Sequence, residues 1–212
     1  MNRPRIILAD DHAMIVDALK NLLQSEFDVV GTFNDGLSLV DGAAELKPDI
    51  IVLDISMPTM NGLIAGPRLK QIMPLVRLIY LTVNQDPEIA AEAFRLGASG
   101  YVLKTSAATE LLQALRQVVR GGYYVTPLMT KGMEGSFVKN FKQMKSKYHL
   151  TIRQKEVLQL LAEGRSMKQV ALVLNLSPRT IAFHKYSMME HLHITSSAGL
   201  IEFAMKSSLA PA

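Results

Sequence analysis

Short apolar runs alternate with helical patterns through the first half of the chain. Such runs, bounded by polar and turn residues, predict strands that are buried on both faces of a sheet. Five runs are present: Ile6–Leu8, Val29–Val30, Ile50–Leu53, Leu78–Leu81 and Tyr101–Leu103. The stretches between them carry apolar residues at helical spacing, for example at positions 15–23 and 111–119. This alternation over about 120 residues predicts an α/β fold with a five-stranded, doubly wound parallel sheet.

Helix signals dominate the chain from Thr151 onward. Residues 122–148 show no sustained periodicity, and we expect a linker with at most one short helix there. Beyond the linker, capping residues mark the starts of four short helices, at Thr151–Gln154, Ser166–Gln169, Ser177–Pro178 and Ser196. Gly164 marks the end of the first of these helices. We therefore expect residues 1–121 to form the α/β domain and residues 149–212 to form a small all-α domain.

Composition excludes several classes of protein. The 212 residues contain no cysteine, which excludes disulfides, zinc–thiolate sites and thiol catalysis. No apolar run approaches the roughly 18 residues of a membrane span, and the first residues lack the apolar core of a signal peptide, so we expect a cytoplasmic protein without membrane contact.

Charge is distributed unevenly along the chain. Residues 1–121 carry 11 basic and 14 acidic side chains, a net charge of −3, whereas residues 122–212 carry 12 basic and 5 acidic side chains, a net charge of +7. The basic half is as consistent with a nucleic-acid partner as with a solubilising surface.

Reactive side chains follow four of the five predicted strands. Asp10 and Asp11 come just after the first run, Asp54 after the third, Thr82 after the fourth and Lys104 after the fifth. Because the carboxyl ends of parallel strands share one edge of a sheet, we expect three carboxylates, a hydroxyl and an ammonium group to meet there. Each residue alone is commonly a cap or a turn residue, so the prediction depends on the joint pattern.

This set of side chains suits phosphate chemistry. Three carboxylates repel one another unless a cation lies between them, and an all-oxygen site with few carboxylates suits Mg²⁺. A carboxylate beside Mg²⁺ can attack a phosphoryl group and form an acyl phosphate. Lys104 and the hydroxyl of Thr82 are suited to bind the phosphoryl oxygens.

The motifs around these residues resemble the receiver domain of two-component response regulators. They are Asp10-Asp11, Asp54-Ile55-Ser56-Met57-Pro58, Thr82 and Gly100-Tyr101-Val102-Leu103-Lys104, and the resemblance covers residues 3–121. It implies that a histidine kinase phosphorylates Asp54 and that Lys104 pairs with the phosphoryl group.

The same resemblance implies a metal site and a switch. Mg²⁺ would be held by Asp10, Asp11, Asp54 and the backbone carbonyl of Ser56. Phosphorylation would draw in Thr82 and let Tyr101 move inward. From the residues alone, Tyr101 is equally well explained as a core aromatic ring of the sheet.

Two positions depart from the receiver pattern. Pro67 falls where receivers continue a helix, and since an interior proline costs about 3 kcal/mol, we expect that helix to begin late, near Gly66–Pro67. Thr105 follows Lys104 where many receivers have proline, which leaves the geometry of that peptide bond open. A haloacid-dehalogenase-like phosphohydrolase is a rival interpretation, but it needs a second aspartate where this chain has Ser56. We therefore expect that the protein is not a metabolic enzyme.

One helix of the second domain places aromatic side chains on its outer face. On a helical wheel of residues 178–192, Ile181, His184, Met188 and Leu192 share the face toward the core. The opposite face carries Arg179, Ala182, Phe183, Tyr186 and Glu190, with Lys185 at its edge. Exposed aromatic and cationic side chains suit the major groove of DNA, and a protein-binding surface is the alternative.

This second domain looks like the helix-turn-helix domain of the NarL/FixJ, or LuxR-type, regulators. The matching motifs are Thr151–Leu158, the turn at Gly164 and Leu176–His184, and the resemblance covers residues 149–207. It implies a scaffold helix around Met167–Leu174 and a recognition helix at Pro178–His191. The implied DNA contacts come from the recognition helix: Arg179, Thr180, Ala182, Phe183, Lys185 and Tyr186.

Three positions of the second domain depart from that family. Ala182 and His191 stand where the family often has lysine or another polar residue. Gly199 lies inside the last helix, where it costs about 1 kcal/mol relative to alanine. Because the last helix often dimerises in this family, Gly199 leaves that role open here.

Together these patterns predict a response regulator of the NarL/FixJ type. A partner kinase would phosphorylate Asp54, and the protein would then dimerise, bind promoter DNA and alter transcription, with RNA polymerase as a further contact. We expect the basic domain to dock on the acidic one before phosphorylation, since their net charges are opposite. Two alternatives are a second domain that binds protein, and DNA binding that ignores phosphorylation.

Overall fold

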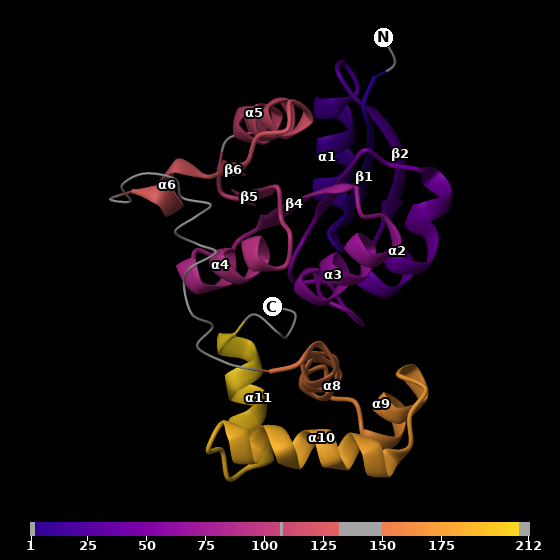
Figure 1. The fold of residues 1–212 in the computed structure, drawn as a ribbon, viewed down its shortest axis with the longest axis vertical. Coiled ribbons are helices and arrows are strands. Elements are labelled where there is room, and N and C mark those ends of the chain that lie inside the picture. The colour runs from indigo at the N-terminus through magenta and orange to yellow at the C-terminus, as the bar shows by residue number, and fades with distance from the viewer. Residues whose placement is uncertain (1–2, 107, 132–149, 208–212) are drawn as a thin grey trace.

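Figure 1 shows an α/β unit and a smaller helical unit stacked along the long axis of the molecule. This computed structural model describes residues 3–106, 108–131 and 150–207. The predicted linker therefore lies outside the described residues from position 132 onward. Within the described ranges, no helix is both long and apolar enough to cross a lipid bilayer.

The α/β unit is built on one sheet of parallel strands. Its first five strands are β1 (Arg5–Ala9), β2 (Asp28–Phe33), β3 (Ile50–Leu53), β4 (Arg77–Thr82) and β5 (Gly100–Leu103). They lie in the order β2-β1-β3-β4-β5, so the chain switches direction across the sheet between β1 and β3. Ligands of doubly wound folds bind at the carboxyl ends of the strands beside this switch point.

The prediction of five strands was wrong by one. A sixth strand, β6 (Tyr124–Val125), pairs in parallel with β5 at the edge of the sheet. Two residues are too few to form a recognisable apolar pattern, and they fall within the expected linker. A four-residue helix, α6 (Pro127–Thr130), follows. Val125 and Met129 pack into the core beside the sheet, which attaches this segment to the α/β unit.

Helices cover both faces of the sheet. On one face lie α1 (Ala13–Leu23) and α5 (Ala108–Val119), and on the other lie α2 (Gly36–Gly42) with the short 3-10 helix η1 (Ala43–Leu46), α3 (Gly62–Ile72) and α4 (Pro87–Arg95). Successive residues of a strand point to opposite faces, so Ile7 belongs to one apolar core and Ile6 and Leu8 to the other. Burial on both faces explains the continuous apolar runs of the sequence.

Helix α3 begins earlier than the sequence predicts. It starts at Gly62 rather than near Gly66–Pro67, and Pro67 lies inside it. The side chain of Asn61 accepts a hydrogen bond from the N–H of Ile64 at 3.0 Å, which caps the first turn upstream of the proline. Gly62 lies so close to the carbonyl oxygen of Asp54 that a Cβ atom there would collide with it. The cap and this close packing hold the first turn despite the cost of about 3 kcal/mol for an interior proline.

A second close approach in α3 provides a test of core packing. A Cβ atom on Gly66 would lie 2.0 Å from the hydroxyl oxygen of Tyr80, a buried ring whose hydroxyl donates to the carbonyl oxygen of Gly62 at 3.2 Å. We expect Gly66→Ala to lower the free energy of unfolding by roughly 2–3 kcal/mol, the cost of overpacking a core. Denaturant titration measures this loss. Combining it with Tyr80→Phe should recover part of the loss, and purely additive effects would contradict the explanation.

The helical unit contains α8 (Ile152–Ala162), α9 (Met167–Val173), α10 (Pro178–His191) and α11 (Ser197–Lys206). The predicted helix starts are confirmed, because capping boxes open α8 and α9 and serine side chains cap α10 and α11. Gly164, with φ of +81°, lies just after α8 as expected. The four helices enclose a core of their own that includes Val157, Ile181 and Leu200.

Candidate functional site

Side chains from the ends of three strands meet at the switch point of the sheet. Asp10 follows β1, Asp54 follows β3 and Lys104 follows β5. The Nζ atom of Lys104 lies 2.7 Å from Oδ2 of Asp10 and 2.8 Å from Oδ2 of Asp54. The two aspartates are only 4% and 3% exposed. One ammonium group therefore bridges two buried carboxylates, and the structure brings these three predicted residues together.

Burial and charge act in opposite directions on the ionisation of this site. Burial raises the pKa of Asp54 above its usual value, and the hydrogen bond from Lys104 offsets part of that rise. Burial lowers the pKa of Lys104, but its hydrogen bonds to Asp10 and Asp54 outweigh this effect and raise the pKa overall. The ammonium group therefore keeps its proton beside Asp54, where a fixed positive charge can bind a phosphoryl oxygen.

Asp54 also belongs to a cluster of side chains that could hold a metal ion. Potential ligand atoms of Asp10, Asp11, His12 and Asp54 all lie within 4.8 Å of one another. The Nδ1 atom of His12 lies 2.9 Å from Oδ1 of Asp11 and 3.1 Å from Oδ1 of Asp10. Three carboxylates so close together carry more negative charge than Lys104 balances, so this donor set fits a divalent cation. The sequence prediction missed His12, although its place directly after Asp11 keeps it in the same loop.

Thr82 and Tyr101 lie inside the sheet and contact the same residue. Thr82 is fully buried at the end of β4, and its hydroxyl oxygen accepts a hydrogen bond from the N–H of Asn84 at 3.2 Å. The ring of Tyr101 is also fully buried, and its hydroxyl donates to the carbonyl oxygen of Asn84 at 3.0 Å. The ring of Tyr101 therefore lies inward and packs in the core in this conformation, and its movement on phosphorylation stays a prediction.

Ser56 lies in the loop between β3 and α3, two residues after Asp54. A backbone hydrogen bond from Ser56 contributes to lowering the pKa of Asp54, against the effect of burial. Thr59 in the same loop has φ of +65°, a left-handed conformation that β-branched residues rarely adopt. On the other side of the site, the peptide bond between Lys104 and Thr105 is trans.

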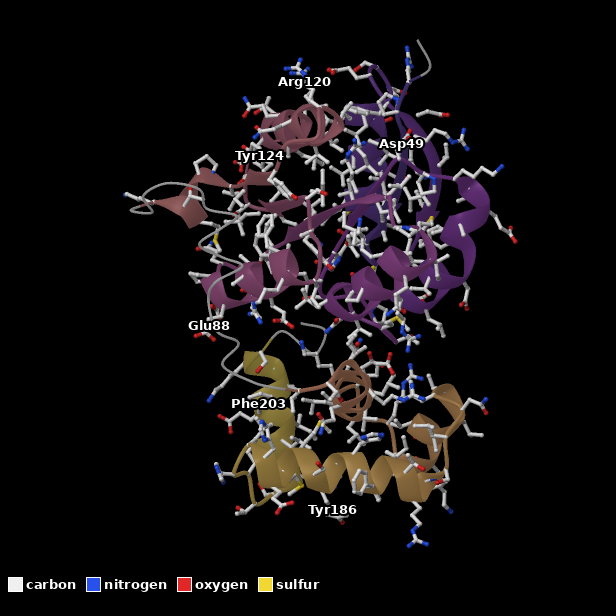
Figure 2. The ribbon with its side chains drawn as sticks, viewed as in Figure 1. Asp49, Glu88, Arg120, Tyr124, Tyr186 and Phe203 are labelled. Atoms are coloured by element: carbon white, nitrogen blue, oxygen red, sulfur yellow. The ribbon has the colours of Figure 1, made fainter. Side chains whose placement is uncertain are left out.

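Helix α10 presents two aromatic rings to solvent. Phe183 is 68% exposed and Tyr186 is 60% exposed, whereas Ile181 and Met188 are fully buried beneath the helix. Figure 2 shows Tyr186 on the side of α10 that faces away from the α/β unit. His184 is half-buried, and its ring lies edge-on to that of Phe183 with 5.9 Å between the ring centres. The predicted division into an inner and an outer face is thus present in the structure.

The other predicted DNA contacts lie on the same helix. Arg179 is exposed, Ala182 is half-buried, and half-buried Thr180 shares a hydrogen bond of 2.8 Å with the capping hydroxyl of Ser177. Lys185 donates to the hydroxyl of Ser197 at 2.7 Å, and its Nζ atom lies 5.6 Å from the centre of the Tyr186 ring. All six predicted residues belong to α10.

Helix α8 packs against the α/β unit next to Asp54. The side-chain amide of Gln159 donates to the carbonyl oxygen of Met57 at 2.9 Å and accepts from the N–H of Asn61 at 2.7 Å. Glu163, just beyond the helix, accepts from the N–H of Thr59 at 2.8 Å. The helical unit thus contacts the loop that leads away from Asp54, a contact that no local sequence signal predicts.

Two ion pairs flank this contact, and they have opposite polarity. Lys155 on α8 lies 2.7 Å from Glu92 on α4, whereas Arg68 on α3 pairs with Glu156 on α8. The cation belongs to the helical unit in the first pair and to the α/β unit in the second. The two units are in contact, and the pair of Arg68 with Glu156 runs against the polarity that their net charges favour. That this docking precedes phosphorylation stays a prediction.

Comparison with known protein families matches both units. A model of the response regulator receiver domain matches residues 6–116. A model of bacterial regulatory proteins of the luxR family matches residues 148–204.

Relatives extend this match along the whole chain. Oxygen regulatory protein NreC of Staphylococcus carnosus (strain TM300) is 33% identical over 213 residues, which cover 97% of this chain and 98% of that protein. NreC of Staphylococcus aureus (strain MRSA252) is 34% identical with the same coverage.

Solved structures show the same architecture. A structure of the Salmonella typhimurium RcsB response regulator, 27% identical, has a TM-score of 0.70 and covers 98% of this chain and 99% of its own. RcsB from Salmonella enterica serovar Typhimurium, bound to a promoter in the presence of the phosphomimetic BeF3⁻, is 27% identical with a TM-score of 0.65 and covers 98% of both chains. The chain therefore belongs to the two-component response regulators that join a receiver domain to a LuxR-type helix-turn-helix domain.

Proposed function

We propose that the protein is a DNA-binding transcriptional regulator that a partner histidine kinase controls by phosphorylating Asp54. The observation that carries this proposal is the Lys104 bridge between Asp54 and Asp10, in the same chain that exposes two aromatic rings on α10. The first arrangement suits a phosphoryl group and the second suits DNA, and a regulator is the class of protein that uses both. The structure of an RcsB–DNA complex supports this assignment, because RcsB is a response regulator with the same architecture.

Asp54 is the phosphoryl acceptor in this proposal. Its carboxylate attacks the phosphorus of the kinase phosphohistidine, the P–N bond breaks, and the kinase imidazole leaves with the bonding electron pair. Lys104 binds one phosphoryl oxygen and the Thr82 hydroxyl donates to another. Mg²⁺, held by Asp10, Asp11, Asp54 and the carbonyl oxygen of Ser56, would neutralise charge on the phosphoryl oxygens.

The outer face of α10 is the proposed DNA-binding surface. Helix α10 would enter the major groove while α9 supports it from above the DNA backbone. In this proposal Arg179 and Lys185 contact phosphates, whereas Phe183 and Tyr186, at the centre of the helix, contact base edges. Thr180 and Ala182 complete this face, and their small side chains let the backbone of α10 come close to the DNA.

Substitutions on α10 test this surface directly. Lys185→Ala should weaken binding to all sequences and reduce the slope of log affinity against log salt by about 1, as the loss of one phosphate contact does. Phe183→Ala and Tyr186→Ala should instead change sequence preference, with about 1–3 kcal/mol of discrimination lost at the contacted base pair. Titrations of variant DNA sites at several salt concentrations measure both effects.

Lys206→Ala is the matched control for Lys185→Ala. Lys206 is an exposed lysine on α11 that pairs with Glu202, so removing it changes the net charge without touching α10. If the Lys185, Phe183 and Tyr186 variants all bound the native site as well as the unmodified chain does, the recognition surface would lie elsewhere.

The exposed aromatic rings also suit a protein partner, which is the alternative function of the helical unit. A DNA complex formed through several phosphates weakens steeply as salt rises. Binding to promoter fragments that is absent, or that does not change between low and physiological salt, would favour the protein partner.

Two copies of the protein are expected on each DNA site. A single helix-turn-helix unit reads one short half-site, so useful specificity requires a second copy at the neighbouring half-site. We propose that phosphorylation of Asp54 favours this homodimer and that the bound dimer contacts RNA polymerase.

A further inference from the structure

The helical unit holds three backbone groups of the loop that follows Asp54. Gln159 bonds both the carbonyl oxygen of Met57 and the N–H of Asn61, and Glu163 bonds the N–H of Thr59. The amide of Gln159 also donates to Oε1 of Glu163 at 2.9 Å, and Gln159 is fully buried. Gln159 and Glu163 therefore form one connected pair, named the loop clamp below, with the hydrogen-bonding groups of the Gln159 amide engaged.

The clamped loop is held in a strained conformation. Thr59, at its centre, is a β-branched residue with φ of +65°. Such a conformation persists only where the surrounding structure imposes it. The N–H of Thr59 points to the carboxylate of Glu163, so part of what imposes this conformation comes from the DNA-binding unit.

The clamped loop is also directly connected to the phosphorylation site. Ser56, whose carbonyl oxygen is a proposed metal ligand, is the residue immediately before Met57. At the other end of the loop, Gly62 packs against the carbonyl oxygen of Asp54, so closely that a Cβ atom there would lie 2.3 Å from it. A change in the conformation of residues 57–61 therefore reaches both Ser56 and Asp54.

The contact leaves the DNA-binding surface uncovered. Figure 1 shows α8 next to the α/β unit and α10 on the far side of the helical unit. Phe183 and Tyr186 on α10 are exposed while the loop clamp is closed. The clamp therefore does not act by hiding the recognition helix from DNA.

We propose that Gln159 and Glu163 are positioning residues of the phosphorylation site, and that the loop clamp opposes the binding of Mg²⁺ and a phosphoryl group at Asp54. The proposal rests on Asp54 being the phosphoryl acceptor. In the clamped conformation Lys104 bridges Asp10 and Asp54. A phosphoryl group that binds between these carboxylates displaces Lys104 from its bridging position. A loop held at three backbone groups resists any accompanying movement of Ser56 and Asp54. Because coupling between two equilibria is reciprocal, occupation of the site opens the clamp, and opening the clamp favours occupation of the site.

Isothermal titration of the full chain with BeF3⁻ in saturating Mg²⁺, and with MgCl2 alone, tests the proposal. We expect Gln159→Ala to bind BeF3⁻ about five-fold more tightly than the unmodified chain, a coupling at the low end of the usual range. Glu163→Ala should shift the affinity in the same direction by a smaller factor, since it removes one of the three loop contacts. Equal or weaker BeF3⁻ affinity in both variants would overturn the proposal.

Gln154→Ala is the matched control. It is the same substitution on the same helix, but among the residues that the structure describes the side chain of Gln154 bonds to Thr151, within the capping box of α8, and not to the α/β unit. This variant lowers the stability of α8 without touching the receiver, so its BeF3⁻ affinity should equal that of the unmodified chain. An increase as large as that of Gln159→Ala would show that loosening of α8, rather than release of the loop, causes the effect, and would overturn the proposal.

DNA affinity is a second readout, and it distinguishes a clamp that acts on the phosphorylation site from one that hides the recognition helix. Without Mg²⁺ or BeF3⁻, Gln159→Ala should bind a single half-site as well as the unmodified chain, because α10 is already exposed. A several-fold rise in half-site affinity would mean that the clamp controls access to DNA instead. If no variant bound BeF3⁻, the assignment of Asp54 would itself fail, an outcome distinct from equal binding by all variants.

Discussion

Asp54→Ala should abolish phosphorylation of the purified protein. Incubation with acetyl phosphate or phosphoramidate should label the unmodified chain at one site, and only when Mg²⁺ or Mn²⁺ is present. The reason lies in the geometry at the switch point, where Lys104 lies 2.8 Å from the Asp54 carboxylate and three acidic side chains converge. Mobility shift on a phosphate-binding gel, with and without a chelator, measures the loss.

Asp17→Ala is the control for this experiment. Asp17 is an exposed aspartate on α1, so its removal changes the charge equally but leaves the cluster intact. We expect it to be labelled like the unmodified chain. Continued labelling of Asp54→Ala at a single site would show that a neighbouring carboxylate, such as Asp10, is the true acceptor.

Phosphorylation should raise DNA affinity by about 100-fold at a site with two half-sites, because the second half-site is then bound intramolecularly by the second protomer. The same treatment should raise the dimer fraction. A shift of the ratio of active to inactive conformation from 1:99 to 99:1 requires about 5.5 kcal/mol of differential binding. A few kcal/mol from the phosphoryl contacts therefore produces most of the change. Sedimentation velocity and DNA titration on the same samples, with and without BeF3⁻, measure both quantities.

Thr82→Ala separates phosphorylation from its consequences. Asp54 should still be labelled, because the acceptor carboxylate and Lys104 are untouched. The rise in dimer fraction and in DNA affinity should disappear, since Thr82 connects the site to Asn84, which also accepts the hydroxyl of buried Tyr101. If the unmodified chain had the same sedimenting mass and the same DNA affinity with and without phosphorylation, the protein would not switch in this way.

Local signals in the sequence predicted most of the helices and the main strands correctly. The caps of α8, α9, α10 and α11 depend on residues no more than three positions apart, so the sequence alone locates them. The apolar runs located β1, β3, β4 and β5, because strands buried on both faces need continuous apolar residues. The order of strand and helix then predicts that Asp10, Asp54 and Lys104 lie at one edge of the sheet.

Other features depend on residues far apart in the chain. The two residues of β6 form a strand only because the exposed edge of β5 offers them a partner. Helix α3 extends upstream of Pro67 because Asn61 caps it and Gly62 packs against Asp54. Neither the pairing edge nor the close approach is visible in the neighbouring sequence.

The sequence by itself determined the two domain types, the meeting of Asp10, Asp54 and Lys104 at one edge of the sheet, and the two faces of α10, since each follows from short-range spacing or from the shared edge of a parallel sheet. Only the tertiary structure decided that Tyr101 lies inward and that His12 joins the acidic cluster. It also decided that Gln159 and Glu163 hold the loop after Asp54, although about a hundred residues separate the two segments. Side-chain amides and carboxylates find such backbone partners only once both domains have folded, because the hydrogen bonds depend on the relative position of two surfaces rather than on spacing along the chain.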